Sequence, residues 1–135
     1  MTKVLILRFF QTGDSLVVIP GLFHLTLVRN TGIAFGFLKE HSEVLLWLIT
    51  LSLVLLLVWG IRLGSVPSLA RAGLSFILGG AVGNWIDRLR YGAVVDFLDF
   101  RIWPVFNLAD AAISIGVGMY ALCILFRRET KEAKT

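Results

Sequence analysis

The chain has 135 residues, of which 57% are hydrophobic and 16% are charged, and its mean hydropathy is +0.84. A soluble domain of this length cannot bury so much apolar surface, so the composition excludes an ordinary soluble globule and indicates an α-helical integral membrane protein with a single domain over residues 1–135. The net charge of +4 comes without a basic run interleaved with aromatic residues, so we expect no nucleic-acid partner. The single cysteine, Cys123, excludes an internal disulfide.

The first 43 residues are expected to lie outside the hydrocarbon of a membrane. Residues 4–7 are apolar but too few to span it. Pro20-Gly21 is a turn signal, and residues 23–28 alternate between apolar and polar side chains, which predicts a short strand. An apolar patch follows at residues 33–38. We therefore predict an extracytoplasmic β-rich segment over about residues 15–38, lying on the membrane surface.

Long apolar stretches make up most of the remaining chain. The first of them carries no charge and has Trp47 and Trp59 near its ends, where aromatic residues anchor helices at the membrane interface. About twenty helical residues cross a bilayer, and each stretch has eighteen or more. The predicted spans of this helix bundle are residues 44–61, 69–86 and 109–126.

The distribution of Arg and Lys predicts an orientation for these spans. The short loop near residues 62–71 carries Arg62 and Arg71 and no acidic residue, and the C-terminal tail is also basic. Positive loops stay in the cytoplasm, so residues 1–43 and 87–106 are expected on the outer side.

Glycine and polar residues form a pattern in the second predicted span. Gly79 and Gly83 are four residues apart, which predicts a face where a neighbouring helix can approach closely. Gly80, Asn84 and Asp87 follow at helical spacing and predict a single polar stripe at the outer end of this helix.

Two carboxylates at the membrane edge are the strongest candidates for chemistry, because a charge there is costly to keep. Asp96 lies in a strand-like run, and Asp110 opens the last predicted span. Each has a structural alternative: Asp110 would complement a helix dipole, and Asp96 would pair with Arg88 or Arg90. Asp99 competes with Asp96, but on a strand it faces the opposite side.

Two carboxylates in one poorly hydrated site share a proton, because both cannot ionise cheaply. The ionised one can take a proton from water while the protonated one hydrogen-bonds a carbonyl, so the pair can hydrolyse a peptide bond with no metal or cofactor. His24 and His41 have no third ligand at metal-binding spacing, so no metal site is predicted.

Two other functions stay open. One is a small proton- or ion-coupled membrane transporter, which would use the same membrane-edge charges as a relay. The last predicted span has no continuous polar path, which disfavours it. The other is a non-catalytic scaffold that packs through Gly79 and Gly83.

Four blocks of this chain resemble, in order and spacing, the motifs of the bacterial lipoprotein signal peptidase (signal peptidase II) family. The resemblance covers roughly residues 2–126, and the combination of blocks is highly specific. The blocks are Asn-Thr-Gly-Ile-Ala-Phe at residues 30–35, Gly-Gly-Ala-Val-Gly-Asn-Trp-Ile-Asp-Arg at 79–88, Val-Val-Asp-Phe at 94–97 and Phe-Asn-Leu-Ala-Asp at 106–110.

The resemblance implies an aspartic endopeptidase of the bacterial cytoplasmic (inner) membrane. Such an enzyme removes signal peptides from diacylglyceryl-modified prolipoproteins and cuts before the lipidated cysteine, with its active site at the periplasmic, extracytoplasmic face. The implied catalytic pair is Asp96 and Asp110. The implied partners are the prolipoprotein and membrane lipids, with no cofactor, and we expect a monomer. The implied substrate-binding residues are Asn30, Gly32, Asn84, Asp87, Arg88 and Asn107.

The start of the chain departs from this family. The family has four transmembrane helices, and the first carries an Asp-x-x-[Ser/Thr]-Lys block near its outer end. Only Thr2-Lys3 of that block is present here. We therefore expect three spans, without the first helix of the family.

Overall fold

The computed structural model describes residues 2–32, 42–62 and 67–132, with side chains up to residue 126. The predicted surface patch at residues 33–38 and most of the loop between the first two predicted spans lie outside the described residues. The elements in chain order are α1 (Thr2–Phe9), β1 (Ser15–Ile19), β2 (Phe23–Asn30), α2 (Ser42–Arg62), α3 (Ser68–Tyr91), β3 (Val94–Asp99) and α4 (Leu108–Glu132).

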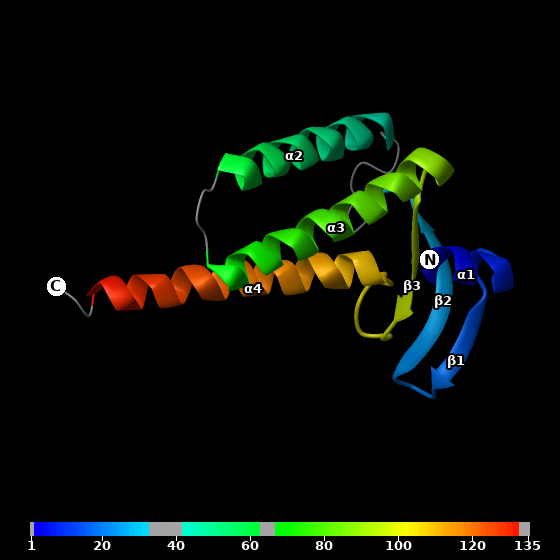
Figure 1. Cartoon of the computed structure of the whole chain (residues 1–135). Coiled ribbons are helices and arrows are strands. Elements are labelled where there is room, and N and C mark those ends of the chain that lie inside the picture. The colour runs from blue at the N-terminus through cyan, green and yellow to red at the C-terminus, as the bar shows by residue number, and fades with distance from the viewer. Residues whose placement is uncertain (1, 33–41, 63–66, 133–135) are drawn as a thin grey trace.

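Three long helices form one part of the molecule and a small sheet forms the other (Figure 1). α3 lies between α2 and α4, and its main contacts are with α4. The sheet and α1 gather at one end of the helices, beside the C-terminal end of α3 and the N-terminal end of α4. The described parts of the segments predicted to lie outside the membrane therefore meet at the same end of the molecule.

Backbone contact between α3 and α4 depends on glycine, but at different positions from those predicted. A Cβ added at Gly73 would lie 2.7 Å from the carbonyl oxygen of Gly116, and one at Gly80 would collide with the carbonyl of Ala109. The prediction for Gly79 is wrong, because a Cβ there meets nothing within 4 Å. Gly73 and Gly80 are seven residues apart and therefore share one face of α3, and this is the face that lies against α4.

The predicted polar stripe of α3 faces the interior of the protein. Gly80, Asn84 and Asp87 are all buried on this helix. The helix ends where Gly92 takes a left-handed conformation with φ of 67°, and its N–H donates to the carbonyl of Arg88. Residues that carry a side chain rarely adopt this backbone conformation, which explains why a glycine ends the helix.

The three strands form an antiparallel sheet in the order β1-β2-β3. In the β2–β3 pair Asp96 lies opposite Val28, and Asn30 lies opposite Val94. This register puts Asn30 and Asp96 diagonally across the same face, because alternate residues of a strand share a face. Beyond β3, Phe106 forms a bridge with Leu98, so the loop between them returns the chain to the sheet just before α4 begins.

The outer surfaces of the helices are apolar. Within the described residues, two helical stretches are long and apolar enough to cross a membrane, Glu43–Arg62 and Leu108–Phe126. They agree with the first and third predicted spans. The second, residues 69–86, is not among them, since its glycines, Arg71 and Asn84 make it less apolar. It stays a prediction.

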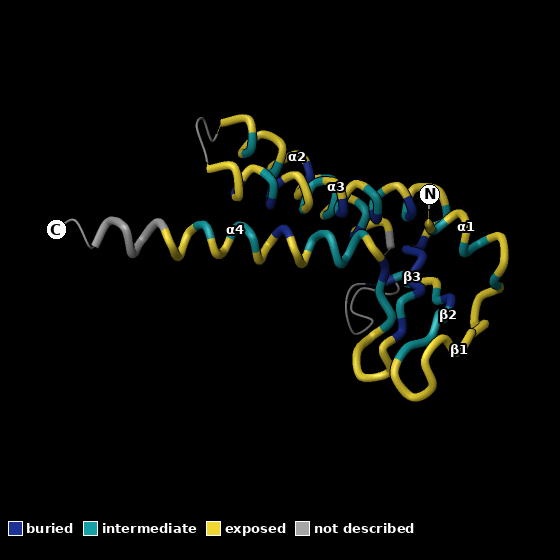
Figure 2. Tube along the Cα trace, turned by 60° about the horizontal axis from the view of Figure 1, so that its bottom comes forward, coloured by how far each residue is buried: buried dark blue, intermediate teal, exposed yellow. Residues whose placement is uncertain are grey.

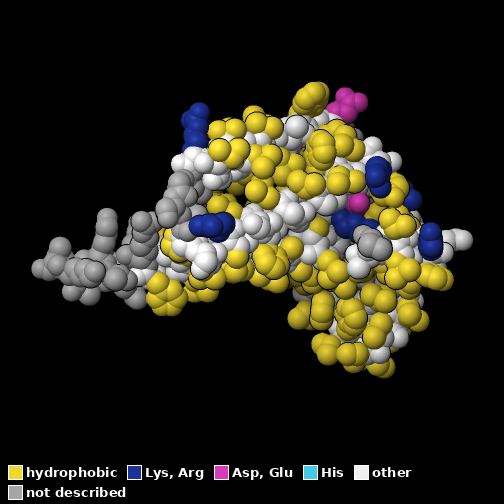
Figure 3. Space-filling model, in the orientation of Figure 1, with side chains coloured by type: hydrophobic (Ala, Val, Ile, Leu, Met, Phe, Trp, Pro, Cys, Tyr) yellow, Lys and Arg dark blue, Asp and Glu magenta, His cyan; other side chains and the backbone are white. Residues whose placement is uncertain are grey.

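The pattern of exposure fits the apolar composition. Exposed positions recur along α2 and α4, and every residue of β1 is exposed (Figure 2). Hydrophobic side chains cover much of the face seen in Figure 3, and the charged ones lie mainly near the two ends of the helices. This arrangement suits a molecule whose helices contact lipid instead of water.

Candidate active site

Asp96 and Asp110 come from different elements and are held by the same asparagine. Asp96 lies in the middle of β3 and is only 2% exposed, whereas Asp110 lies in the first turn of α4 and is half-buried. The Nδ2 of Asn107 donates to Asp96 Oδ1 at 2.6 Å, and the backbone N–H of Asn107 donates to Asp110 Oδ2 at 3.1 Å. The structure therefore brings the two predicted carboxylates to the two sides of one residue.

Asn107 also caps α4. Its Oδ1 accepts hydrogen bonds from the N–H groups of Ala109 at 2.7 Å and Asp110 at 3.3 Å. Asp110 in turn accepts a hydrogen bond from the N–H of Asn107, which is the reciprocal arrangement of a capping box. The structural alternative for Asp110, a charge at a helix N-terminus, is thus present together with its place beside Asp96.

Two more asparagines complete the hydrogen bonds of the carboxylates. Asn84 Nδ2 donates to Asp110 Oδ1 at 2.7 Å, and Asn30 Nδ2 donates to Asp96 Oδ2 at 3.0 Å. The Oδ1 of Asn84 accepts from Asn107 Nδ2 at 3.1 Å. All four carboxylate oxygens therefore accept an N–H, three from side-chain amides and one from the backbone.

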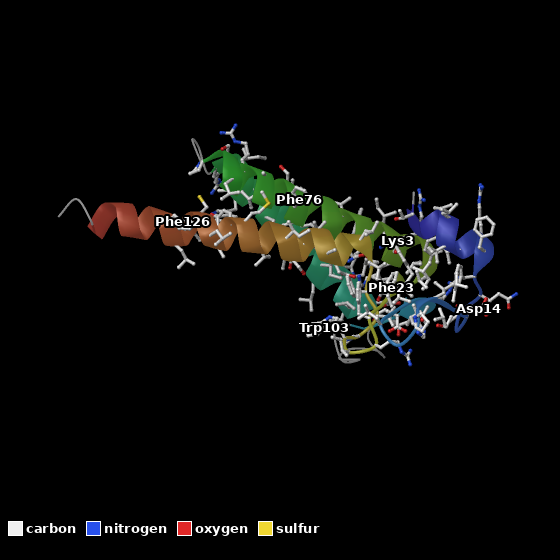
Figure 4. All side chains as sticks on the ribbon, turned by 90° about the horizontal axis from the view of Figure 1, so that it is seen from below. Lys3, Asp14, Phe23, Phe76, Trp103 and Phe126 are labelled. Atoms are coloured by element: carbon white, nitrogen blue, oxygen red, sulfur yellow. The ribbon has the colours of Figure 1, made fainter. Side chains whose placement is uncertain are left out.

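A lysine and two residues of α3 border this network. Lys3 Nζ lies 2.7 Å from both Asn84 Oδ1 and Asp87 Oδ2, where α1 meets α3 (Figure 4). Asp87 Oδ2 also accepts the buried N–H of Val95, the residue before Asp96. Asp87 is therefore an ion-pair and hydrogen-bond centre near the C-terminal end of α3.

Arg88 connects α3 to the chain beyond β2. Its Nη2 donates to the carbonyl of Gly32 at 3.1 Å, and the N–H of Gly32 donates to Asn30 Oδ1 at 3.1 Å. Within the described residues, the buried Nε of Arg88 has no hydrogen-bond partner. Arg88 thus holds the segment that carries Asn30 and keeps one donor unused.

Burial raises the pKa of Asp96 above its ordinary value, and the nearby charge of Asp110 raises that pKa further. The hydrogen bonds from Asn107 and Asn30 and the charge of Lys3 oppose this rise without cancelling it. Asp96 therefore holds a proton to higher pH than a carboxyl group in water.

Asp99, the competitor of Asp96, belongs to a different contact. It accepts hydrogen bonds from Thr26 and from the backbone and side chain of Arg101. Burial favours the neutral form of Asp99, but these bonds and the charge of Arg101 outweigh it and lower its pKa. Asp99 thus stays charged and fastens β3 to β2 and to the following loop.

Two apolar cavities open beside the network. One, of about 480 Å³, includes Asp110 and Ser114 and is walled by aromatic residues of the loop after β3. The other, of about 350 Å³, runs between α2 and α3 and reaches Asn84 and Arg88 at its polar end. The remaining residues that line this second cavity are Leu45, Leu48, Ile49, Ser52, Leu53, Leu56, Ala81 and Ile113.

The structure brings every predicted site residue into this one region. Asn30 and Gly32 come from β2 and the residues after it, and Asn107 immediately precedes α4. Lys3 was missed as a site residue. The sequence does contain one indication of its role, because Lys3 stands within an apolar segment and belongs to the Thr2-Lys3 remnant of a family block. A short N-terminal helix, however, gives no pattern that would place Lys3 beside α3. Among the described residues no group of three or more His, Cys, Asp or Glu side chains is placed to hold a metal.

Solved structures define the class of this protein. Two structures described as bacterial membrane enzymes share its architecture, with TM-scores of 0.88 and 0.81, each at 33% sequence identity. The first covers 96% of this chain and 82% of the solved chain, and the second covers 92% and 83%. The fold is therefore that of a bacterial membrane enzyme.

Sequence relatives make the identification more specific. Residues 1–126 match the family of signal peptidase (SPase) II. The lipoprotein signal peptidase of Moorella thermoacetica is 50% identical over 117 residues, which are 87% of this chain and 78% of the relative. That of Brevibacillus brevis is 46% identical over 123 residues, which are 90% and 83%. The chain belongs to the signal peptidase II family, and the resemblance predicted from its motifs is confirmed.

Proposed function

We propose that this protein removes signal peptides from diacylglyceryl-modified prolipoproteins and cuts before the lipidated cysteine, with Asp96 and Asp110 as the catalytic pair. The observation that carries the proposal is the shared asparagine: Asn107 donates one hydrogen bond to each carboxylate. Two aspartates held side by side in a largely buried network are the acid–base equipment of metal-free peptide hydrolysis.

The environments of the two carboxylates suggest their roles. Burial and the neighbouring charge raise the pKa of Asp96, so in this proposal Asp96 is the member of the pair that holds the shared proton. Asp110 lies at the N-terminus of α4, where the helix dipole stabilises negative charge, and it lines the cavity of about 480 Å³. Asp110 is therefore the base and Asp96 the acid.

The reaction then proceeds by attack of water on the scissile carbonyl carbon. Asp110 takes a proton from the water, while Asp96 hydrogen-bonds the carbonyl oxygen and stabilises the negative charge that develops on it. When the tetrahedral intermediate collapses, the C–N bond breaks and the proton held by Asp110 passes to the leaving amine of the cysteine. The Nε of Arg88, which has no hydrogen-bond partner among the residues that the structure describes, is a donor for a substrate carbonyl near the same place.

The cavity between α2 and α3 is the proposed seat of the signal peptide. It is apolar along most of its length and ends at Asn84 and Arg88, so an apolar helix lying in it would deliver its end to the polar network. The diacylglyceryl chains stay in lipid. In this proposal α3 is the second of three spans, the sheet lies at the periplasmic face of the inner membrane, and Asn30, Gly32, Asn84, Asp87, Arg88 and Asn107 shape the substrate site.

The test is cleavage of a lipidated prolipoprotein by purified protein in detergent. Asp96→Asn and Asp110→Asn keep the shape of each side chain but remove the carboxyl group that gives or takes a proton, so each is expected to lose more than about a thousandfold in kcat. Asp14→Asn, in the turn before β1, is the matched control and should cleave at the full rate. Full turnover by either variant of the pair would contradict the proposal, and coupled ion flux without proteolysis would support the transporter instead.

A further inference from the structure

Among the residues that the structure describes, Lys3 is the only cationic side chain that donates to an asparagine of the network around the two aspartates. It lies on α1, its side chain is 14% exposed, and its Nζ is 2.7 Å from Asn84 Oδ1 and 2.7 Å from Asp87 Oδ2. Nothing in the proposed reaction uses Lys3. A lysine held this far from solvent with two short contacts needs a role of its own, because burying a charge is costly.

The first contact determines which way the Asn84 amide faces. An ammonium group has three donors and no acceptor, so the atom of Asn84 that faces Lys3 must be the oxygen. The amide nitrogen then faces Asp110 and donates to its Oδ1 at 2.7 Å. If the Asn84 amide were reversed, its oxygen would face Asp110 Oδ1 and its NH₂ group would face the ammonium group of Lys3. Both contacts would then be repulsive.

The second contact reaches the other carboxylate through the backbone. Asp87 Oδ2 accepts from Lys3 and from the N–H of Val95, which precedes Asp96 in β3. Lys3 therefore orders one residue that holds Asp110 and one that holds the strand of Asp96. Lys3 interacts with the carboxylates of Asp87 and Asp96, and Asp96 in turn interacts with the charges of Asp110 and Arg88.

We propose that Lys3 is a positioning residue of the catalytic pair, which sets the orientation of the Asn84 amide and anchors Asp87 so that Asp110 and Asp96 keep their hydrogen-bond donors. The inference rests on the proposed function, since it assigns a role within that reaction. It concerns the chemical step rather than binding of the substrate, because Lys3 lines neither of the two cavities beside the aspartates.

The test compares Lys3→Met with Arg8→Met, an exposed cation on the same helix. Lys3→Met is expected to lower kcat about 10- to 100-fold with KM within about twofold, as an interaction that acts only in the chemical step does. It also removes a positive charge that lowers the pKa of Asp96, so the high-pH limb of the rate profile should move to higher pH. Arg8→Met should change neither the rate nor the profile. An unchanged kcat and pH profile for Lys3→Met would overturn the inference.

A double-mutant cycle separates positioning from a merely structural role. If Lys3 acts through Asn84, adding Lys3→Met to Asn84→Ala lowers kcat by much less than Lys3→Met does alone. Full multiplication of the two losses, with no shift of the pH profile, would contradict the inference. Lys3→Arg keeps the charge, so it should fold even if Lys3→Met does not, and its pH profile should stay near that of the parent while kcat falls. A shifted profile for Lys3→Arg with unchanged kcat would also contradict it.

Failure of this inference differs from failure of the proposed function. If Asp96→Asn cleaves substrate, the proposed function is wrong whatever Lys3 does. If Asp96→Asn is inactive while Lys3→Met matches the parent protein, only the role of Lys3 is wrong.

Discussion

Asn107 combines two tasks that a single side chain rarely carries. Its oxygen caps α4, and its nitrogen donates to Asp96 and to Asn84. It is fully buried, so every one of these groups would be costly to leave unpaired. The cap places Asp110 and the amide nitrogen holds Asp96, and the distance between the two carboxylates is therefore set by one residue.

Asn107→Ser separates the two tasks. Serine is a good N-cap, so the start of α4 should persist, but the donor to Asp96 is lost. Losing this donor leaves a buried oxygen of Asp96 unpaired, at a cost of about 1–3 kcal/mol, so we expect cleavage to fall about 10- to 100-fold. That hydrogen bond lowers the pKa of Asp96, so its loss raises the pKa and moves the high-pH limb of the rate profile to higher pH.

The measurement is the pH dependence of kcat for Asn107→Ser and Asn107→Ala, together with thermal unfolding in detergent. Alanine loses the cap as well, so Asn107→Ala should unfold more easily than Asn107→Ser by about 1 kcal/mol. An unshifted pH profile for Asn107→Ser would show that the side-chain amide of Asn107 does not act on Asp96.

At the scale of elements, the contact between α3 and α4 determines where the aspartates stand. Gly73 and Gly80 let the two backbones touch, and Gly80 meets Ala109 in the turn that carries Asp110. Helices without such small residues stay further apart. A shift of α4 away from α3 would separate Asp110 from Asn84, its partner on α3.

Neighbouring glycines provide a matched pair for testing this contact. Gly80→Ala puts a methyl group against the carbonyl of Ala109, so α4 must move, at a cost of about 1–3 kcal/mol. Gly79→Ala puts the same group into open space and should be neutral or stabilising by up to about 1 kcal/mol. The thermal unfolding temperature in detergent and the cleavage rate should both fall for Gly80→Ala, and neither should fall for Gly79→Ala. Equal behaviour of the two variants would contradict the contact.

At the scale of the whole molecule, the polar network lies where three apolar helices meet a sheet. The cavity between α2 and α3 leads to this junction, and seven of its ten lining residues are aliphatic. A peptide in the cavity would be held by apolar contact along its length, and its reacting bond would reach the polar end. In the proposed function, binding and chemistry are therefore separated along the axis of the helices.

This separation predicts a variant that impairs binding alone. Ser52 lines the cavity, whereas Leu51 is 56% exposed on the outer side of the same helix. Ser52→Trp fills the cavity, so KM for a lipidated prolipoprotein should rise about tenfold or more with kcat little changed. Leu51→Trp adds the same bulk on the lipid side and should leave both constants near the parent values. A fall in kcat at unchanged KM for Ser52→Trp would place the signal peptide elsewhere.

Local pattern was sufficient for several elements of this protein. Hydropathy over consecutive residues predicted the long helices, and alternation predicted β2. The carboxylates were identifiable because Asp96 and Asp110 stand beside apolar runs, where a charge is costly. All of these signals lie within a few residues of chain, and the amino-acid sequence alone determined them.

Only the tertiary structure decided how these residues meet. Gly79 and Gly80 look equivalent in sequence, and the packing of α4 selects Gly80. Lys3 reaches Asn84 across 81 positions, and Asn30 reaches Asp96 across 66. Such contacts depend on the register of a sheet and on the rotation of helices about their axes, which are set by the packing of the whole molecule and leave no periodic trace in the chain. The sequence alone determined which groups carry charge, and the fold decided which amide each charge faces.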